Sequence, residues 1–381
     1  MYYWRLSAFY LFYFAALGAL VPYWGLYLKT LGFSIVEIGE LIAIIMATKI
    51  VAPNVWGWIA DHTGRRMKIV RIASLLATLT FAGVFLGSSY WWMAFVMVLF
   101  SFFWNAALPQ FEATTLNHLG ADPHRYSTVR LWGSIGFIIA VVGLGFAFQW
   151  VGISLLPLVV LALFGGIWIS SLAVPESAAA HPALDDEPLM TVLRRPAVVS
   201  VLLLCFLIQA SHGPYYTFYS LYLVDYGYTE AAVGQLWALG VVAEIGVFLK
   251  MQNWLPRIGA RRLLLIATAL TVVRWLLVGL FVEQLWILIL AQALHAASFG
   301  VYHAVAIHLI HHLFTGRHQG RGQALYSSLS FGAGGAVGSL AAGYLWDGVG
   351  AQWMYIAAAV IAALASWIAW RGIEEEPDRA T

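Results

Sequence analysis

Twelve long apolar segments follow one another along this chain, and this succession constrains its fold more than any other feature. A helix needs about 20 apolar residues to cross the hydrocarbon core of a bilayer, and each segment reaches that length. The segments occupy residues 4–28, 36–59, 67–87, 91–117, 127–149, 152–174, 197–224, 230–253, 262–282, 285–314, 319–346 and 351–371. We therefore expect an all-α membrane protein with 12 transmembrane helices.

The composition excludes a soluble fold. Apolar residues make up 62% of the chain and charged residues 10%, whereas soluble domains carry about 25% charged residues. The apolar run 8–28 is longer than the core of a signal peptide, and a second long run follows it, so we interpret it as the first span. The lone cysteine, Cys205, leaves no disulfide framework.

Basic residues set the orientation. With an even number of spans both termini share one side, and 16 of the 20 Lys and Arg residues fall on that side. These are Arg5, Arg65, Arg66, Lys68, Arg71, Arg125, Arg194, Arg195, Lys250, Arg257, Arg261, Arg262, Arg317, Arg321, Arg371 and Arg379. Only Lys29 falls on the other side, and three more lie within spans. Cytoplasmic loops are enriched in Lys and Arg, so we expect both termini in the cytoplasm and a location in a bacterial-type inner (cell) membrane.

The chain divides into two similar halves. A polar stretch at 175–195 predicts a cytoplasmic linker between six-helix bundles formed by residues 1–174 and 196–381. The motif that contains Gly57, Asp61, Gly64, Arg65 and Arg66 follows the second span. A glycine and paired arginines recur after the eighth span, at Gly259, Arg261 and Arg262. Such internal duplication is typical of secondary transporters.

Together with this motif, several ordered pieces carry a family resemblance: Val129–Ser134, His212–Tyr216, Leu236–Glu244, Val273–Trp275 and Leu294–His295. On these residues the chain resembles the major facilitator superfamily, and within it the proton symporter branch of the 3-phenylpropionate transporters and, more distantly, the lactose permeases. The resemblance implies two pseudo-symmetric six-helix bundles that transport by alternating access.

It also implies a monomeric symporter, in contact with the lipid bilayer, for a proton and a small organic solute. The first candidate solute is an aromatic carboxylate such as 3-phenylpropionate, and the alternative is a sugar or nucleoside. We expect no enzymatic activity, no cofactor or metal, and no nucleic-acid partner.

The resemblance to lactose permeases implies roles for named positions. Asn105 and Glu112 match the fourth-helix acidic motif, Arg130 the fifth-helix arginine, Arg274 the ninth-helix arginine, and His295 the histidine of the proton-coupling group. The pattern departs in three places. Ser298 replaces an acid that is central to proton release, the eighth-helix acid moves by about one turn to Glu244, and an acidic pair of the seventh helix has no counterpart.

Charged residues inside spans carry the functional prediction, because each costs about 2.5–3.5 kcal/mol at the centre of a membrane helix. We expect Glu112 and Arg130 to approach each other from antiparallel helices, either as a fixed ion pair or as a pair that opens when Arg130 binds substrate. Arginine suits a carboxylate because its planar fork donates two parallel hydrogen bonds. Lys49 has either a carboxylate substrate or a helix carbonyl as its partner.

In the second half, Glu244 and His295 are candidates for carrying the proton. Arg274 lies close by, and we expect it, like Arg130, to bind polar groups of the substrate. His295 could equally be a hydrogen-bonded structural histidine. Aromatic residues near these charges, each of which could also be simple packing, would suit a ring that bears a carboxylate, or a sugar face. They are Tyr215, Tyr216, Phe218, Trp237 and Trp275.

The motif at residues 57–66 and the histidine run at 308–312 each allow more than one interpretation. The residues 57–66 could form a conformational gate, or could simply anchor the topology through their positive charge. The run His308–His312 fits H-x-x-H-H, a pattern of membrane-embedded metal-dependent hydroxylases. Metal sites need several converging ligands, and the sequence has no second box of this kind, so the enzyme remains a remote alternative.

Overall fold

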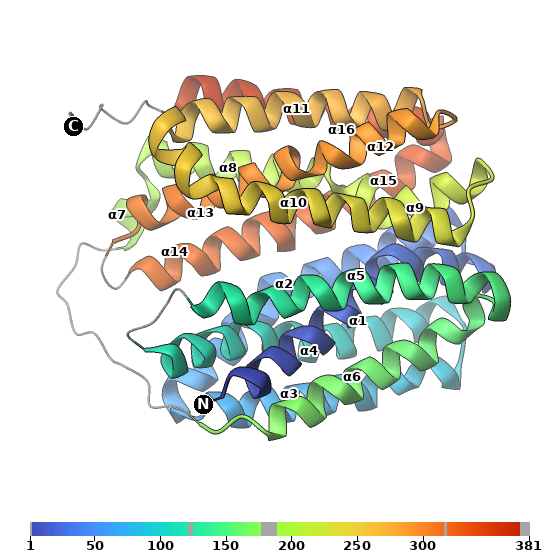
Figure 1. Cartoon of the computed structure of the whole chain (residues 1–381), viewed down its shortest axis with the longest axis horizontal. Coiled ribbons are helices and arrows are strands. Elements are labelled where there is room, and N and C mark those ends of the chain that lie inside the picture. The colour runs from blue at the N-terminus through green and yellow to red at the C-terminus, as the bar shows by residue number, and fades with distance from the viewer. Residues whose placement is uncertain (1, 121–124, 177–188, 316–317, 374–381) are drawn as a thin grey trace. The chain divides into compact units, whose positions relative to one another are not determined.

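The computed structural model of the chain describes residues 2–120, 125–176, 189–315 and 318–373, and every regular element in these ranges is a helix (Figure 1). The all-α expectation is confirmed. Most of the expected linker, together with Arg317 and Arg379 of the basic-residue count, lies outside the described residues.

The first half contains α1 to α6. Their bounds are α1 Tyr3–Thr30, α2 Ile35–Thr63, α3 Arg66–Phe81, α4 Tyr90–Leu119, α5 Arg125–Val151 and α6 Leu156–Leu172. Short 3₁₀ turns extend α3 (η1 Ala82–Leu86) and precede α6 (η2 Ile153–Leu155). The six helices, with η1 and η2 added to α3 and α6, therefore correspond to the first six apolar segments.

In the described residues of the second half, the short helix α7 Leu189–Leu193 comes first and nine further helices follow it. They are α8 Pro196–Ser211, α9 Gly213–Asp225, α10 Glu230–Ile258, α11 Ala260–Leu280, α12 Leu285–Ala293, α13 Tyr302–Leu313, α14 His318–Ser327, α15 Gly335–Val349 and α16 Ala351–Gly372. Two π-helical segments, η3 Ala296–Val301 and η4 Ser328–Gly334, connect α12 to α13 and α14 to α15.

Among the described residues, ten helical stretches are long and apolar enough to cross a membrane. They correspond to all the expected segments except 36–59 and 319–346. These two are helical as well, as α2 and as the run from α14 to α15. The count of twelve spans stays a prediction.

Three of the expected segments are interrupted helices. The seventh breaks at His212, where Pro214 has no N–H to donate to the carbonyl four residues earlier. The tenth and eleventh contain η3 and η4, and π-helical turns are frequent at functional sites.

Positive-φ glycines recur at matched turns of the two halves. Gly32 and Gly227 follow the first and seventh apolar segments, and Gly64 and Gly259 follow the second and eighth. Gly152 and Gly350 precede the helices of the sixth and twelfth segments, and the three spacings are 195, 195 and 198 residues. At Gly64 (φ 65°) the glycine forms the left-handed C-cap of α2, whose start carries a capping box of Ser34 and Glu37.

By contacts between residues, the chain forms two compact units. Unit 1 comprises Met1–His181 and Tyr216–Ala238, and unit 2 comprises Pro182–Tyr215 and Leu239–Thr381. In unit 1, α1 packs on α5 and α6, and α4 on α2 and α3. In unit 2, α16 packs on α8 and α11 (Figure 1). The π-helical segment η4 also packs on α8.

Each unit contains a seam where two helix backbones touch. A Cβ built on Gly136 of α5 would lie 2.2 Å from the carbonyl oxygen of Leu11 in α1, and one on Gly338 of α15 would lie 2.3 Å from that of Ala210 in α8. Small residues permit such close helix packing in membranes. The seams occupy corresponding places, since α1 and α5 contain the first and fifth apolar segments, and α8 and α15 belong to the seventh and eleventh.

The start of α10 belongs to unit 1 because it packs on α1 and α5. The hydroxyl of Tyr23 donates to the carbonyl of Val141 at 2.6 Å, and the carbonyl of Glu230 lies 3.5 Å from the same hydroxyl. Gly234 makes room for this contact, because a Cβ there would lie 2.4 Å from the Val141 oxygen.

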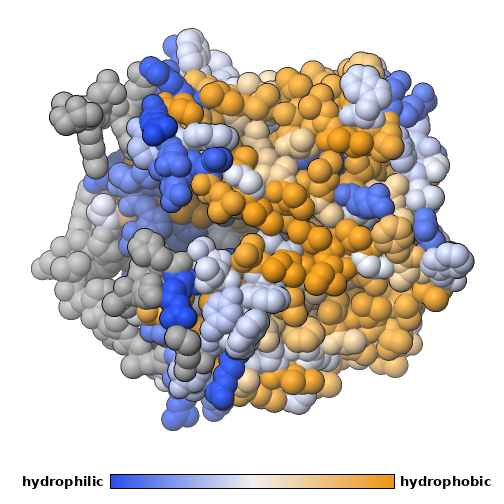
Figure 2. All heavy atoms as spheres, in the orientation of Figure 1, coloured by the Kyte–Doolittle hydropathy of each residue, from blue (hydrophilic) through white to orange (hydrophobic). Residues whose placement is uncertain are grey.

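The exterior of the helices is apolar. On the face shown in Figure 2, apolar residues cover most of the helix flanks, and hydrophilic residues gather mainly toward the helix ends. Several exposed tryptophans lie in the first or last turns of their helices, where a membrane–water interface favours them. These are Trp4, Trp91, Trp150, Trp286, Trp353 and Trp370.

Candidate functional site

Arg274 lies at the centre of a buried polar cluster in unit 2. Its side chain, on α11, has no exposed surface. Nε donates to the carbonyl of Ala291 at 3.0 Å, Nη1 donates to Ser298 Oγ at 3.0 Å, and Nη2 lies 3.5 Å from Gln292 Oε1. No carboxylate lies within 4.0 Å of this guanidinium in the parts of the chain that the structure describes. A full cation is thus buried among neutral acceptors.

Two aromatic rings cover the guanidinium of Arg274. Its Cζ lies 4.2 Å from the ring centre of Tyr215 and 4.5 Å from that of Trp275. The Tyr215 hydroxyl donates to Gln292 Oε1 at 3.1 Å, so it shares this acceptor with Arg274. Ring faces carry partial negative charge and partly replace a counter-ion.

Glu244 and His295 add a carboxylate and an imidazole to the same cluster. His295 Nε2 lies 3.5 Å from Glu244 Oε2, and the two side chains are 6% and 17% exposed. The His295 ring lies 5.5 Å from the ring of Tyr215 and stacks on Phe299 at 5.5 Å. The structure therefore brings together four of the predicted residues: Arg274, Glu244, His295 and Tyr215. Ser298 occupies the place of the missing acid and binds Arg274 instead.

Arg130 lies in unit 1, on α5. Its Cζ lies 3.7 Å from the ring centre of Phe14 and 5.8 Å from that of Tyr10, both on α1. Gly133, one turn later, leaves the space for this arrangement, because a Cβ there would lie 2.6 Å from Arg130 Nη1 and 2.8 Å from Phe14. Within the described ranges Arg130 forms no hydrogen bond and no ion pair. Its donors are therefore available.

The expected contact between Glu112 and Arg130 is not an ion pair in this structure. Glu112 Oε1 instead accepts a hydrogen bond from the hydroxyl of Tyr126 at 3.3 Å. Arg130 lies against Phe14 rather than within 4.0 Å of the carboxylate. The carboxylate of Glu112 on α4 therefore contacts Tyr126, and the guanidinium of Arg130 on α5 contacts Phe14.

Asn105 holds α4 against α2. Its amide donates to Thr48 Oγ1 at 2.9 Å and to the carbonyl of Ile45 at 3.3 Å, and Thr48 also donates to Ser101 at 2.8 Å. The neighbouring Lys49 is half-buried in the middle of α2, and it makes neither a hydrogen bond nor an ion pair with any residue that the structure describes.

Tyr216 and Trp237 belong to unit 1, whereas Tyr215 belongs to unit 2. Their rings stack at 6.3 Å, and the Trp237 indole donates to Ser220 Oγ at 3.0 Å. The buried Phe218 lies on the same helix, α9. The aromatic residues grouped together from sequence therefore belong to two environments.

In the motif of residues 57–66, Arg66 connects two helices. It forms an ion pair with Asp61 at 2.7 Å and donates to Gln110 Oε1 of α4 at 2.9 Å. Gly57 faces the same amide, since a Cβ there would lie 3.6 Å from Gln110 Nε2. Arg65 has no partner in the described part of the chain.

Sequence reasoning missed Gln110 and Gln292. Both are buried neutral amides that accept from an arginine, Gln110 from Arg66 and Gln292 from Arg274. Each lies in an apolar segment within one or two helical turns of an ionisable residue. Only this proximity could have indicated from the sequence that the glutamine has a role in the site.

The histidine run on α13 does not assemble a metal site. His312 Nδ1 bonds to the carbonyl of His308 at 2.9 Å, and His311 contacts Gln319. Across the described residues, no group of three or more His, Cys, Asp or Glu side chains is placed to hold a metal ion.

Known proteins with similar sequences are transporters. A protein of Escherichia coli (strain K12) named probable 3-phenylpropionic acid transporter is 31% identical over 355 residues, which cover 90% of each chain. The maltose permease of Geobacillus stearothermophilus is 26% identical over 369 residues, covering 94% of this chain and 92% of its own.

Solved structures with a similar fold include a transporter as well. The crystal structure of a mutant of the nucleoside transporter NupG superposes with a TM-score of 0.86, at 15% identity, over 98% of this chain and 100% of its own. Residues 3–357 match the family model described as MFS_1 like family. The chain therefore belongs to the MFS_1 like family, and its relatives identify it as a membrane transporter of the major facilitator superfamily.

Proposed function

We propose that this protein transports a small aromatic carboxylate together with a proton. The observation that carries the proposal is the side chain of Arg130, a half-buried guanidinium in a membrane-spanning helix with no hydrogen-bond partner in the described residues. Burying a cation is costly unless its donors are satisfied. A substrate carboxylate would satisfy them through two parallel hydrogen bonds.

The surroundings of Arg130 suit an aromatic substrate. Phe14 and Tyr10 lie beside the guanidinium, and the ring of Tyr13 lies 5.5 Å from that of Phe14. Aromatic rings attract one another in offset or edge-to-face arrangements. The Escherichia coli relative, whose name specifies 3-phenylpropionic acid, supports the same class of substrate.

The proton is assigned to Glu244 and His295. Their contact at 3.5 Å supports this assignment, because a carboxylate and an imidazole this close could share one proton beside the buried charge of Arg274. Arg274 repels a protonated His295 and attracts an ionised Glu244. A change in the distance between Arg274 and this pair would therefore alter the affinity of the pair for a proton, as proton coupling requires.

The wider arrangement belongs to the same proposal. It comprises twelve spans, bundles at 1–174 and 196–381 with a cytoplasmic linker between them, both termini in the cytoplasm of a bacterial cell, and a monomer that works by alternating access. The matched glycine turns and the two backbone seams support duplicated halves.

A sugar is the second candidate substrate. The maltose permease relative covers nearly the whole chain, and aromatic faces such as those of Tyr216 and Trp237 also stack on sugar rings. The nucleoside transporter shares the fold but only 15% of the sequence, so it carries no weight for the substrate.

Transport by purified protein in proteoliposomes tests the proposal. Labelled 3-phenylpropionate, maltose and uridine would be offered with and without an inward proton gradient. We expect gradient-dependent accumulation of 3-phenylpropionate that a protonophore abolishes. Accumulation of maltose or uridine alone would show that the substrate is a sugar or a nucleoside. Accumulation that does not depend on the proton gradient would contradict proton coupling.

A further inference from the structure

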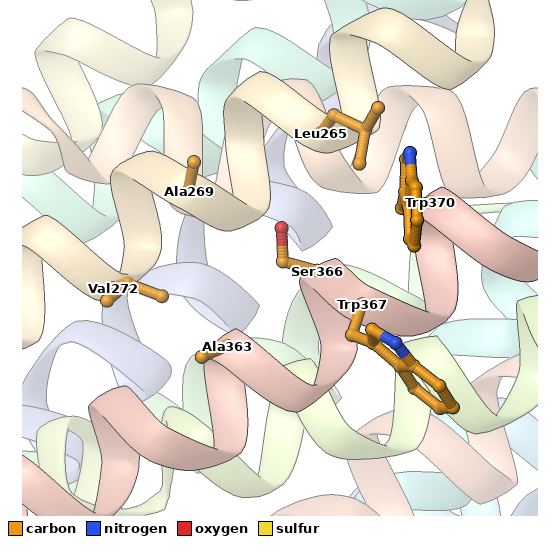
Figure 3. A pocket seen from close by; sticks show the side chains of 7 residues that line it. All are labelled: Leu265, Ala269, Val272, Ala363, Ser366, Trp367 and Trp370. Atoms are coloured by element: carbon orange, nitrogen blue, oxygen red, sulfur yellow. The ribbon is translucent and has the colours of Figure 1, made fainter.

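A shallow groove lies on the outer face of unit 2, between α11 and α16 (Figure 3). It has a volume of about 500 Å³. Its walls come from the two helices, and the Ser366 hydroxyl points into it (Figure 3). The lining residues are Leu265, Ala269, Val272, Ala363, Ser366, Trp367 and Trp370.

The shape of this groove follows from its side chains. Ala269 and Ala363 are small and exposed, whereas Trp367 and Trp370 are large and 57% and 52% exposed. Small residues between large ones leave a channel along the helices. Both helices are membrane-spanning candidates, so the groove faces the acyl chains of the bilayer.

Arginines surround one end of the groove. Arg261 precedes Leu265 by one helical turn, and its Nη2 donates to the carbonyl of Trp370 at 2.9 Å. Arg371 lies over the indole of Trp370, with Cζ 4.8 Å from the ring centre. Arg262 is exposed beside Arg261. Three cations therefore lie where an interfacial tryptophan marks the headgroup level. The chain continues past Ile373 with three glutamates, which lie outside the described residues.

We propose that this groove is a binding site for an anionic phospholipid. The lipid phosphate would bind at Arg261, Arg262 and Arg371, and one acyl chain would lie along the groove between α11 and α16. Basic pockets between membrane helices bind anionic headgroups in this way. The proposal concerns a site outside the transport pathway and does not depend on the identity of the substrate.

A second groove in the same unit provides an internal comparison. It also has a volume of about 500 Å³ and lies toward the other end of α16, between α15 and α16, where Leu345, Val349, Trp353, Ile356 and Ala357 line it. Asp347 is the nearest charge in sequence, and it is exposed. The two grooves match in size and apolar character, but among the described residues they differ in the sign of the charge beside them. Only the first should select an anionic lipid.

Native mass spectrometry of the purified full-length protein tests the site, with phosphatidylglycerol and phosphatidylcholine of identical acyl chains added in equal amounts. We expect the wild-type protein to retain phosphatidylglycerol preferentially. Each juxtamembrane arginine contributes about 1 kcal/mol, so Arg371→Gln should weaken that preference about fivefold and Arg262→Gln should do the same. Arg261 also caps α16, so it is left unchanged.

Groove-filling variants distinguish the two sites. Ala363→Trp should displace the bound phosphatidylglycerol, whereas the matched variant Ala357→Trp in the second groove should not. Equal retention of the two lipids by the wild type, an unchanged preference in Arg371→Gln, or equal loss in both tryptophan variants would overturn the proposal. So would a dimer that Ala363→Trp dissociates, because a second copy of the chain would then occupy the groove.

Discussion

His295 Nε2 lies 3.5 Å from Glu244 Oε2, and this contact joins the π-helical break between α12 and α13 to the middle of α10. Both side chains are largely buried. The pair lies beside Arg274, whose guanidinium has only neutral acceptors among the described residues. Protonation of either partner would change the charge next to a buried cation.

Glu244→Gln should leave substrate exchange intact and remove accumulation driven by a pH gradient. The amide keeps the size of the side chain but cannot take up a proton at neutral pH. Counterflow and gradient-driven uptake in proteoliposomes measure the two activities separately. Glu283→Gln, which changes an exposed acid, is the control and should keep both. Normal accumulation in Glu244→Gln would place the proton on another residue.

Arg130→Ala should all but abolish uptake at substrate concentrations below the wild-type KM, while expression stays normal. Losing a charge-assisted, bidentate contact costs about 1.5–3 kcal/mol, which corresponds to a roughly 10- to 100-fold rise in the KM for a carboxylate substrate. Arg130→Lys keeps the charge without the planar fork and should show a smaller rise. Lys68→Gln removes an exposed charge and should change neither parameter. Wild-type kinetics in Arg130→Ala would exclude this side chain from the binding site.

Gly136→Ala should destabilise the protein, because the added methyl group would lie 2.2 Å from the carbonyl oxygen of Leu11, a backbone atom that cannot turn away. Overpacking of this kind costs about 1–3 kcal/mol. Gly143→Ala, on the same helix, is a matched control, since a Cβ there meets nothing within 4 Å. Thermal unfolding in detergent would compare the two, and equal melting temperatures would contradict the close seam.

Asp61→Asn should lower transport while leaving thermal stability almost unchanged. The Asp61 and Arg66 side chains are 66% and 22% exposed, and an exposed ion pair contributes about 0.2–1 kcal/mol. Gln110→Leu removes the buried acceptor of Arg66 and should lower both transport and stability. If Asp61→Asn transports normally, the residues 57–66 act as a topological anchor and not as a gate.

Much of the fold follows from the sequence alone. Segment length and apolarity predict the helices, because in hydrocarbon the backbone must satisfy its own hydrogen bonds. The break before α9 was not expected, because the segment 197–224 was predicted as one helix, although Pro214 accounts for it. The π-helical segments η3 and η4 were not predictable in this way. They depend on contacts with other helices, such as the approach of Gly334 to the carbonyl of Phe206.

The candidate site was predictable in composition but not in pairing. Buried charges are rare enough that Arg130, Arg274 and Glu244 stand out in an apolar chain. Which partners they meet depends on side-chain rotamers and helix rotation, so the expected ion pair of Glu112 with Arg130 is not formed. Gln110 and Gln292 gave little signal because a neutral amide is a common residue in a buried helix.

The glycine seams of α1 with α5 and of α8 with α15 have a mechanical consequence. Where backbone touches backbone, no flexible side chain remains to be compressed or to change rotamer. Each of these two helix pairs should therefore move as a rigid body. Any conformational change during transport must then take place at helix contacts made by longer side chains.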